Sequence, residues 1–112
     1  MDTHYVHSKF MLNETSFWIQ TANLTKSSFE SSREYFFYSK DKEIHDSLEV
    51  LFDADWNGEV LLSKELHPNL VVCPLNCRDK IKALLENAEI SIKIQTQYIL
   101  DDEILNILYD KV

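Results

Sequence analysis

The sequence predicts an α/β fold, because segments with two-residue and with helical periodicity alternate along its 112 residues. Residues 5–12 and 90–95 alternate with a period of two, whereas residues 41–53 place apolar side chains at helical spacing. The hydrophobic share of 45% is typical of a folded chain, and one Gly and two Pro argue against a turn-rich all-β protein. We therefore expect a small sheet flanked by helices.

The first third of the chain predicts a β-hairpin and a third strand. Residues 5–12 form the first strand, residues 13–16 have turn chemistry, and residues 17–21 form the second strand. A loop rich in Ser, Thr and Asn follows at residues 22–32, with one short helical turn. The aromatic run at residues 34–38 predicts the next strand, because aromatic side chains fit a pleated, half-buried surface.

The rest of the chain predicts helices and strands in alternation. An amphipathic helix runs from Asp41 to about Asp53 and is closed by Asn57 and Gly58, and residues 59–68 form a connector. A short apolar strand at residues 70–73 stops before Pro74. Asn76 caps a helix that reaches about Asn87, residues 90–95 form a further strand, and Asp101 caps the final helix.

The net charge of −8 argues against a basic clamp for nucleic acid, since neutralising phosphates requires clustered Lys and Arg. No stretch approaches the roughly 18 apolar residues that span a bilayer, and no signal peptide is evident. These features predict a cytoplasmic chain or one peripheral to a membrane.

Cys73 and Cys77 are the two cysteines of the chain. Together they would hold a metal only if other ligands converged on them, and His4, His45 and His67 are scattered along the sequence. We therefore expect two free, partly buried thiols in a reducing compartment, and neither a metal nor another cofactor.

His7 and Lys9 are the first candidates for chemistry. Residues i and i+2 of a strand point to the same side, so this imidazole and this ammonium project together. An imidazole attacks phosphorus or transfers protons near neutral pH, and an ammonium beside it neutralises a phosphate oxygen. A His-x-Lys triplet is by itself common on a solvated strand face, so the rest of the pattern has to support this interpretation.

Three further residues extend the candidate site. Thr21 and Asn23 follow the second predicted strand, where a hydroxyl and an amide would donate to the same phosphate oxygen. Glu34 begins the next strand, and a carboxylate there would hold one imidazole nitrogen and leave the other free to attack. A cap or a paired surface group is the simpler interpretation of such Asn and Glu residues.

The ordered string resembles the phospholipase D superfamily. His7-Ser8-Lys9 followed by Gln20-Thr21-Ala22-Asn23 is similar to its His-x-Lys and Gly-Ser-x-Asn motifs, and Glu34 matches its supporting acid. Phe52, Asp55 and Trp56 resemble a segment of bacterial cardiolipin-synthase-like members. The resemblance implies a partial phospholipase D-like mixed sheet flanked by helices.

The resemblance also implies the organisation of a two-lobed enzyme. Residues 1–58 would be the C-terminal part of one lobe, residues 59–68 a connector, and residues 69–112 the N-terminal part of a second lobe. Members of the superfamily combine two His-x-Lys motifs, in which one histidine forms a phosphohistidine and the other protonates the leaving oxygen. The chain has one such motif, so we expect a central fragment whose second histidine comes from another lobe or a homodimer partner.

The implied activity is that of a metal-independent phosphodiesterase or phosphatidyltransferase, acting on phospholipid headgroups in preference to nucleic acid. His7, Lys9, Asn23 and Glu34 would be catalytic, with Lys9, Thr21 and Asn23 on the substrate phosphate. Two alternatives stay open. One is a degenerate, non-catalytic lobe that serves as an interaction module, and the other is a nuclease of the same superfamily.

Two departures from the family pattern bear on these alternatives. The structural acid of the motif falls on Glu14 by counting from Lys9, or on Asn13 if the segment is one residue short. Gln20 and Thr21 stand where the family has Gly-Ser, so a side chain is added where the family has close backbone approach.

Overall fold

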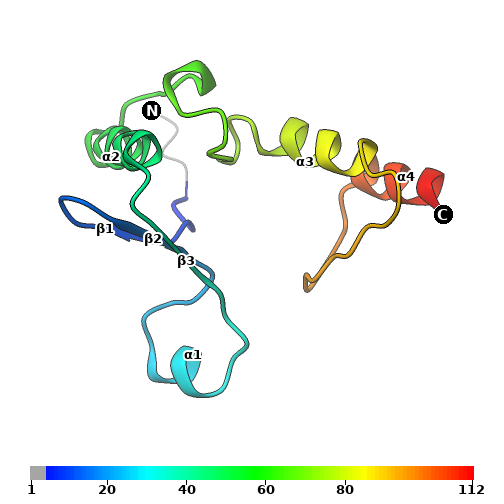
Figure 1. The fold of residues 1–112 in the computed structure, drawn as a ribbon, viewed down its shortest axis with the longest axis horizontal. Helices are drawn as coiled ribbons and strands as arrows, with labels where there is room; N and C mark the ends of the chain where they lie inside the picture. The colour runs from blue at the N-terminus through cyan, green and yellow to red at the C-terminus, as the bar shows by residue number, and fades with distance from the viewer. Residues whose placement is uncertain (1–4) are drawn as a thin grey trace. The chain divides into compact units, whose positions relative to one another are not determined.

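The computed structural model describes residues 5–112, so His4 and the three residues before it lie outside the described part. The chain divides into two compact units, Met1–Leu70 and Val71–Val112 (Figure 1). The structure confirms the α/β class. The assignment of residues 1–58 and 69–112 to two lobes stays a prediction.

The first unit contains a three-stranded sheet in the order β1-β2-β3. Strand β1 (Phe10–Leu12) pairs antiparallel with β2 (Phe17–Gln20), which pairs antiparallel with β3 (Phe36–Ser39). The expected first strand is shorter than residues 5–12, because β2 ends at Gln20 and leaves the residues before Lys9 without a partner strand. All the described strand pairs are antiparallel, since the later strands expected for a mixed sheet do not form.

Helices occupy the predicted places in this unit. The five-residue α1 (Lys26–Glu30) is the expected helical turn, capped by the Thr25 side chain. Helix α2 (Lys42–Asn57) ends four residues later than the sequence predicts. It begins at the Asp41 cap and ends at Gly58, whose φ of 67° is the left-handed conformation that glycine adopts most readily.

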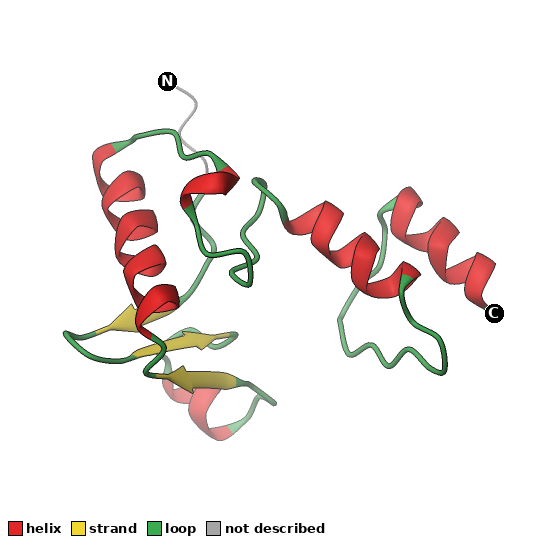
Figure 2. Ribbon diagram, turned by 45° about the horizontal axis from the view of Figure 1, so that its top comes forward, coloured by secondary structure: helices red, strands yellow, loops and turns green. Residues whose placement is uncertain are grey.

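The core of the first unit lies between the sheet and α2, which covers one face of it (Figure 2). Phe17 is fully buried on this face, and its ring lies 6.5 Å from that of His45 in α2. Leu48 of α2 is also almost completely buried. The opposite face of the sheet carries Trp18 and Tyr38, which are partly exposed and whose rings lie 4.8 Å apart.

The second unit consists of α3 (Cys77–Glu86), α4 (Asp102–Lys111) and the loops beside them, after the 3-10 turn η1 (Ser63–Glu65) of the first unit. Asp101 caps α4 as predicted, accepting from the backbone N–H groups of Glu103 and Ile104. Asn76 precedes α3 as predicted, although its side-chain oxygen accepts from the N–H of Val72 at 2.7 Å.

The strands expected at residues 70–73 and 90–95 are absent from the described structure. A strand satisfies its backbone N–H and C=O groups only through a neighbouring strand, and the second unit provides none. Residues 72–76 instead form a local turn, in which the Asn76 N–H donates to the carbonyl of Val72 at 2.9 Å.

Candidate active site

Lys9 is attached to the hairpin immediately before β1. The Gln20 N–H donates to its carbonyl at 3.0 Å, so the strand pairing extends one residue beyond β1. Side chains alternate along a strand, which places Lys9 on the same face as Met11 and its cross-strand partner Trp18. This is the sheet face opposite α2. The pairing therefore holds the His-x-Lys segment beside the end of β2.

His7 is exposed at the start of this segment. The Lys9 ammonium donates to its backbone carbonyl at 2.7 Å, and its ring lies 6.1 Å from that of Tyr5. The imidazole makes no hydrogen bond within the part of the chain that the structure describes. Both ring nitrogens are therefore accessible to a ligand.

Thr21 and Glu34 are brought together at the end of β2. The Thr21 hydroxyl donates to the Glu34 carboxylate and accepts from the Tyr35 N–H at 2.9 Å. The Thr21 N–H also donates to the Tyr35 carbonyl at 3.0 Å. Glu34 thus bonds Thr21, and no hydrogen bond or ion pair joins it to His7 among residues 5–112, so the expected orientation of the imidazole by this carboxylate is not seen.

Asn23 is exposed two residues beyond Thr21. Its carbonyl accepts from the Thr25 N–H at 2.9 Å, which turns the chain toward α1. Its side-chain amide has no hydrogen-bond partner among the described residues. This amide is therefore available to donate to an anionic ligand.

Gln20 occupies the position where the family pattern has Gly. Its side-chain nitrogen donates to the carbonyl of Ala22 at 3.0 Å, while its side-chain oxygen is buried without a partner among the described residues. A glycine would leave this volume empty. The Gln20 side chain consequently occupies space at the end of β2, next to Thr21 and Ala22, that the family pattern leaves open.

Asn13 holds the hairpin turn. Its side-chain oxygen accepts from the Thr15 N–H at 3.0 Å and from the Ser16 N–H and hydroxyl at 2.9 and 3.0 Å. Glu14 is exposed. Of the two positions considered for the structural acid of the motif, Asn13 is the one whose side chain organises the turn.

His45 also fixes this turn, a role that was not predicted from the sequence. It is buried on α2, and its Nε2 donates to the Asn13 carbonyl at 2.6 Å. A signal for it was present in the sequence, because His45 precedes Leu48 by three residues and so shares the apolar face of the helix. Asn13 and His45 together tie the hairpin to α2.

One group of described residues has the composition of a metal site. Ligand atoms of His45, Asp46 and Glu49 lie within 4.8 Å of one another. Nε2 of His45 is already bonded to Asn13, however, and the hydrogen bond from Lys42 at 2.6 Å lowers the pKa of the Asp46 carboxyl. Because these partners account for the histidine and the aspartate, we assign no metal to the group.

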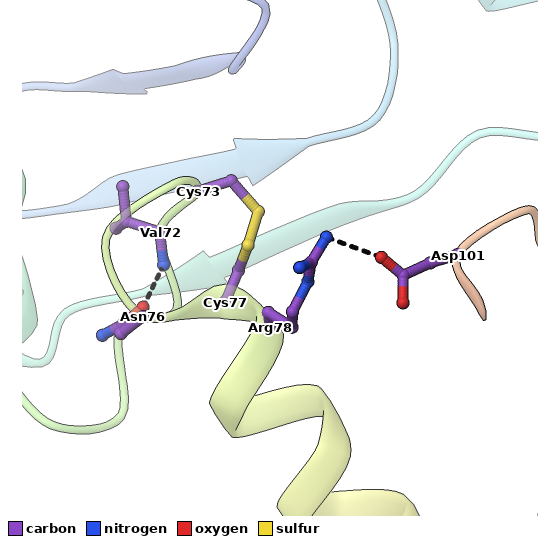
Figure 3. The surroundings of a disulfide bond; sticks show 6 residues. All are labelled: Val72, Cys73, Asn76, Cys77, Arg78 and Asp101. Carbon is purple, nitrogen blue, oxygen red and sulfur yellow. Dashed lines mark hydrogen bonds and ion pairs between the residues drawn. A yellow bond between two sulfur atoms is a disulfide. The ribbon is translucent and has the colours of Figure 1, made fainter. Parts of the chain in front are cut away.

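The two cysteines do not remain free thiols, contrary to expectation. Cys73 and Cys77 form a disulfide, with their Cα atoms 5.0 Å apart (Figure 3). The turn at residues 72–76 brings them together, a geometry that their spacing in the sequence did not reveal. Figure 3 also shows the ion pair between Arg78 and Asp101, at 2.6 Å.

None of the helices in the described part of the chain combines the length and the apolar character needed to cross a membrane.

The comparisons with known proteins bear on the segment that carries the hairpin. The family model of the PLD-like domain of cardiolipin synthase matches residues 1–56, which is half of the chain. No curated protein and no solved structure matched. The matched segment includes the His-x-Lys residues, the end of β2 and Glu34. The chain belongs to the family of the cardiolipin synthase PLD-like domain, within the phospholipase D superfamily.

Proposed function

We propose that this chain supplies one half of the active site of a phospholipase D-type phosphodiesterase or phosphatidyltransferase. The observation that carries the proposal is the hydrogen bond from the Gln20 N–H to the Lys9 carbonyl, within the segment that matches the family. This bond joins Lys9 to Gln20, three residues before Asn23, and His7 lies two residues before Lys9. The two parts of the motif thus belong to one hairpin.

His7 acts as the nucleophile or as the general acid. As nucleophile, one imidazole nitrogen forms a bond to phosphorus while the bond from phosphorus to the leaving oxygen breaks. The second histidine donates a proton to that oxygen. Water or an alcohol then attacks the phosphohistidine, which breaks the N–P bond and gives hydrolysis or transfer. The accessible ring nitrogens of His7 support either role.

Lys9 and Asn23 bind the nonbridging oxygens of the phosphate. The ammonium supplies positive charge and the unpartnered amide supplies a directed donor, so the negative charge of the transition state is stabilised without a metal ion. Thr21 is the third phosphate ligand of the proposal. Its hydroxyl is bonded to Glu34, so we give Glu34 the role of positioning Thr21 beside the phosphate.

The substrate we favour is a phospholipid. A net charge of −8 opposes a polyanionic nucleic acid more strongly than a single headgroup phosphate. The sheet face that carries Lys9 also exposes Met11, Trp18 and Tyr38, a surface suited to an apolar body next to the phosphate. A second His-x-Lys motif would come from another phospholipase D-like lobe or from a second copy of the chain.

The test is turnover of bis(p-nitrophenyl) phosphate and of phosphatidylglycerol vesicles, each in EDTA. We expect hydrolysis or transfer to persist in EDTA and to be lost in His7→Ala and Lys9→Ala. Lys40→Ala is the matched control, because Lys40 is exposed and forms no ion pair among the described residues. Turnover that survives His7→Ala, or that depends on a divalent metal, would overturn the proposal. Cleavage of DNA in place of phospholipid would point to the nuclease.

A non-catalytic interaction module is the second candidate, and Gln20 favours it. Its side chain fills the position where the family has Gly, with a buried oxygen that has no partner among the described residues. If Gln20 blocks the site, Gln20→Gly should raise turnover while leaving far-UV circular dichroism unchanged. A folded chain that is inactive with and without this change supports the interaction module.

A further inference from the structure

The loop between α3 and α4 has the sequence of a strand without the structure of one. Ile90, Ile92 and Ile94 alternate with polar residues, yet Figure 2 draws the whole connection as loop. Residues 90–94 make no hydrogen bond within the described part of the chain. Backbone donors and acceptors of such an apolar segment favour a partner that adds a strand.

Residues 91–94 of this segment border an open groove. The groove has a volume of about 920 Å³ and lies within the second unit, between α3, α4 and the loop. Ile90 is 98% exposed, and only Leu85 is a buried apolar residue in this unit. The apolar groove is lined mainly by Ile81, Leu84, Leu85, Ile92, Ile94 and Ile104.

We propose that residues 89–93, which make no hydrogen bond within the described chain, pair antiparallel with the same residues of a second copy of the chain, centred on Ser91. This register places Glu89 of each copy opposite Lys93 of the other, and Ile90 opposite Ile92. Because the pairing is symmetric, each of these contacts occurs twice. The interface therefore contains two ion pairs and four isoleucines. Opposite charges directly across a strand pair are stabilising, and like charges are destabilising.

The charges discriminate this register from the alternatives. Parallel in-register pairing would set Lys93 against Lys93 and Glu89 against Glu89. Antiparallel pairing centred on Ile92 would place Lys93 opposite Ser91 and leave Glu89 opposite Gln95, without an ion pair across the strands. Lys93 and Glu89 form no ion pair within the described chain, so both are available to a second copy.

The test is the mass of the full chain in solution, measured by size-exclusion chromatography with light scattering. We expect a particle of twice the 13.2 kDa mass of the chain. Glu89→Lys and Lys93→Glu should each weaken the dimer by about tenfold or more, because each change sets like charges opposite one another twice. An equal mixture of the two variants should restore a dimer, since its Glu and Lys residues again oppose each other.

Lys80→Glu is the matched control, because it makes the same charge change at an exposed position of α3. It should leave the dimer intact. A monomeric wild type overturns the proposal, and so does a dimer that persists in both single variants. A mixture that stays monomeric while circular dichroism shows folded chains also overturns it. The measurement needs no turnover, so failure of the proposed chemistry leaves the pairing untouched.

Discussion

The two units of the chain differ in what stabilises them. The first unit contains seven of the eight described apolar residues that are buried, including Phe17 of the sheet and Leu48 of α2. The second unit buries Leu85 alone of that set. A sheet paired within its own unit closes a core, whereas two helices and an unpaired loop leave an open groove.

Polar contacts at the surface take the place of a core in the second unit. Arg78 bonds Asp101 at 2.6 Å and Lys82 bonds Glu103 at 2.8 Å. The ammonium of Lys111 donates to a carbonyl near the end of α3 at 2.6 Å. Exposed ion pairs contribute about 0 to 1 kcal/mol each, so this unit should be the less stable of the two.

The largest expected effect is on the first unit, from Phe17→Ala. Removing this fully buried ring should destabilise the unit by about 3–5 kcal/mol. Trp18 and Trp56 both lie in the first unit, so urea unfolding followed by tryptophan fluorescence reports on it alone. Phe29→Ala is the control, because Phe29 is exposed. Equal stability of the two variants would contradict a core centred on Phe17.

The corresponding change in the second unit is Leu85→Ala. We expect a loss of about 2 kcal/mol, at the lower end for a buried leucine, because an open groove lets the site collapse. Far-UV circular dichroism should record the lost helix while tryptophan fluorescence stays unchanged. A simultaneous change in both signals would show that the two units unfold together.

A smaller effect is expected from Asn13→Ala in the hairpin turn. The change removes an acceptor for three hydrogen bonds in a partly exposed turn and should cost about 0.5–1.5 kcal/mol. Asn13→Asp keeps the acceptor and should be close to wild type. Urea midpoints by tryptophan fluorescence compare the two, and equal losses would mean that the turn does not need this oxygen.

The smallest expected effect is the loss of helix stability as the pH is lowered. The hydrogen bond from Lys82 lowers the pKa of the Glu103 carboxyl, so its stabilising contribution is present above the ordinary pKa and is lost as the pH falls through the lowered value. Asp46 of the first unit, paired with Lys42, has its pKa lowered in the same way. Acid should therefore loosen α3 and α4 while the core holds α2. NMR spectra recorded through an acid titration would test this, and simultaneous loss of all helices would contradict it.

Local signals account for the parts of the fold that were predicted. The caps Thr25, Asp41 and Asp101 and the terminator Gly58 act within a few residues of their own helix, so the sequence indicates each of them. The hairpin was predicted for the same reason. The prediction of strands at residues 70–73 and 90–95 was wrong. An apolar sequence pattern can indicate that a segment suits a strand, but it does not supply a neighbouring strand to bond the backbone.

The candidate site divides in the same way. The order of His7, Lys9, Thr21 and Asn23 along the chain was enough to recognise the family, and the match over residues 1–56 confirms it. The contact of Glu34 with Thr21 in place of His7 was not predictable, since it depends on the register of β2 and β3. The roles of these residues stay proposals.

The sequence by itself determined the α/β class, the helices with their caps, and the family, because these depend on residues close together in the chain. Only the tertiary structure decided that Asn13 organises the turn with His45, that Cys73 and Cys77 are joined, and which alternating segments became strands. Each of these depends on a partner brought close by folding. The spacing of residues in the sequence does not show which of them become neighbours after folding.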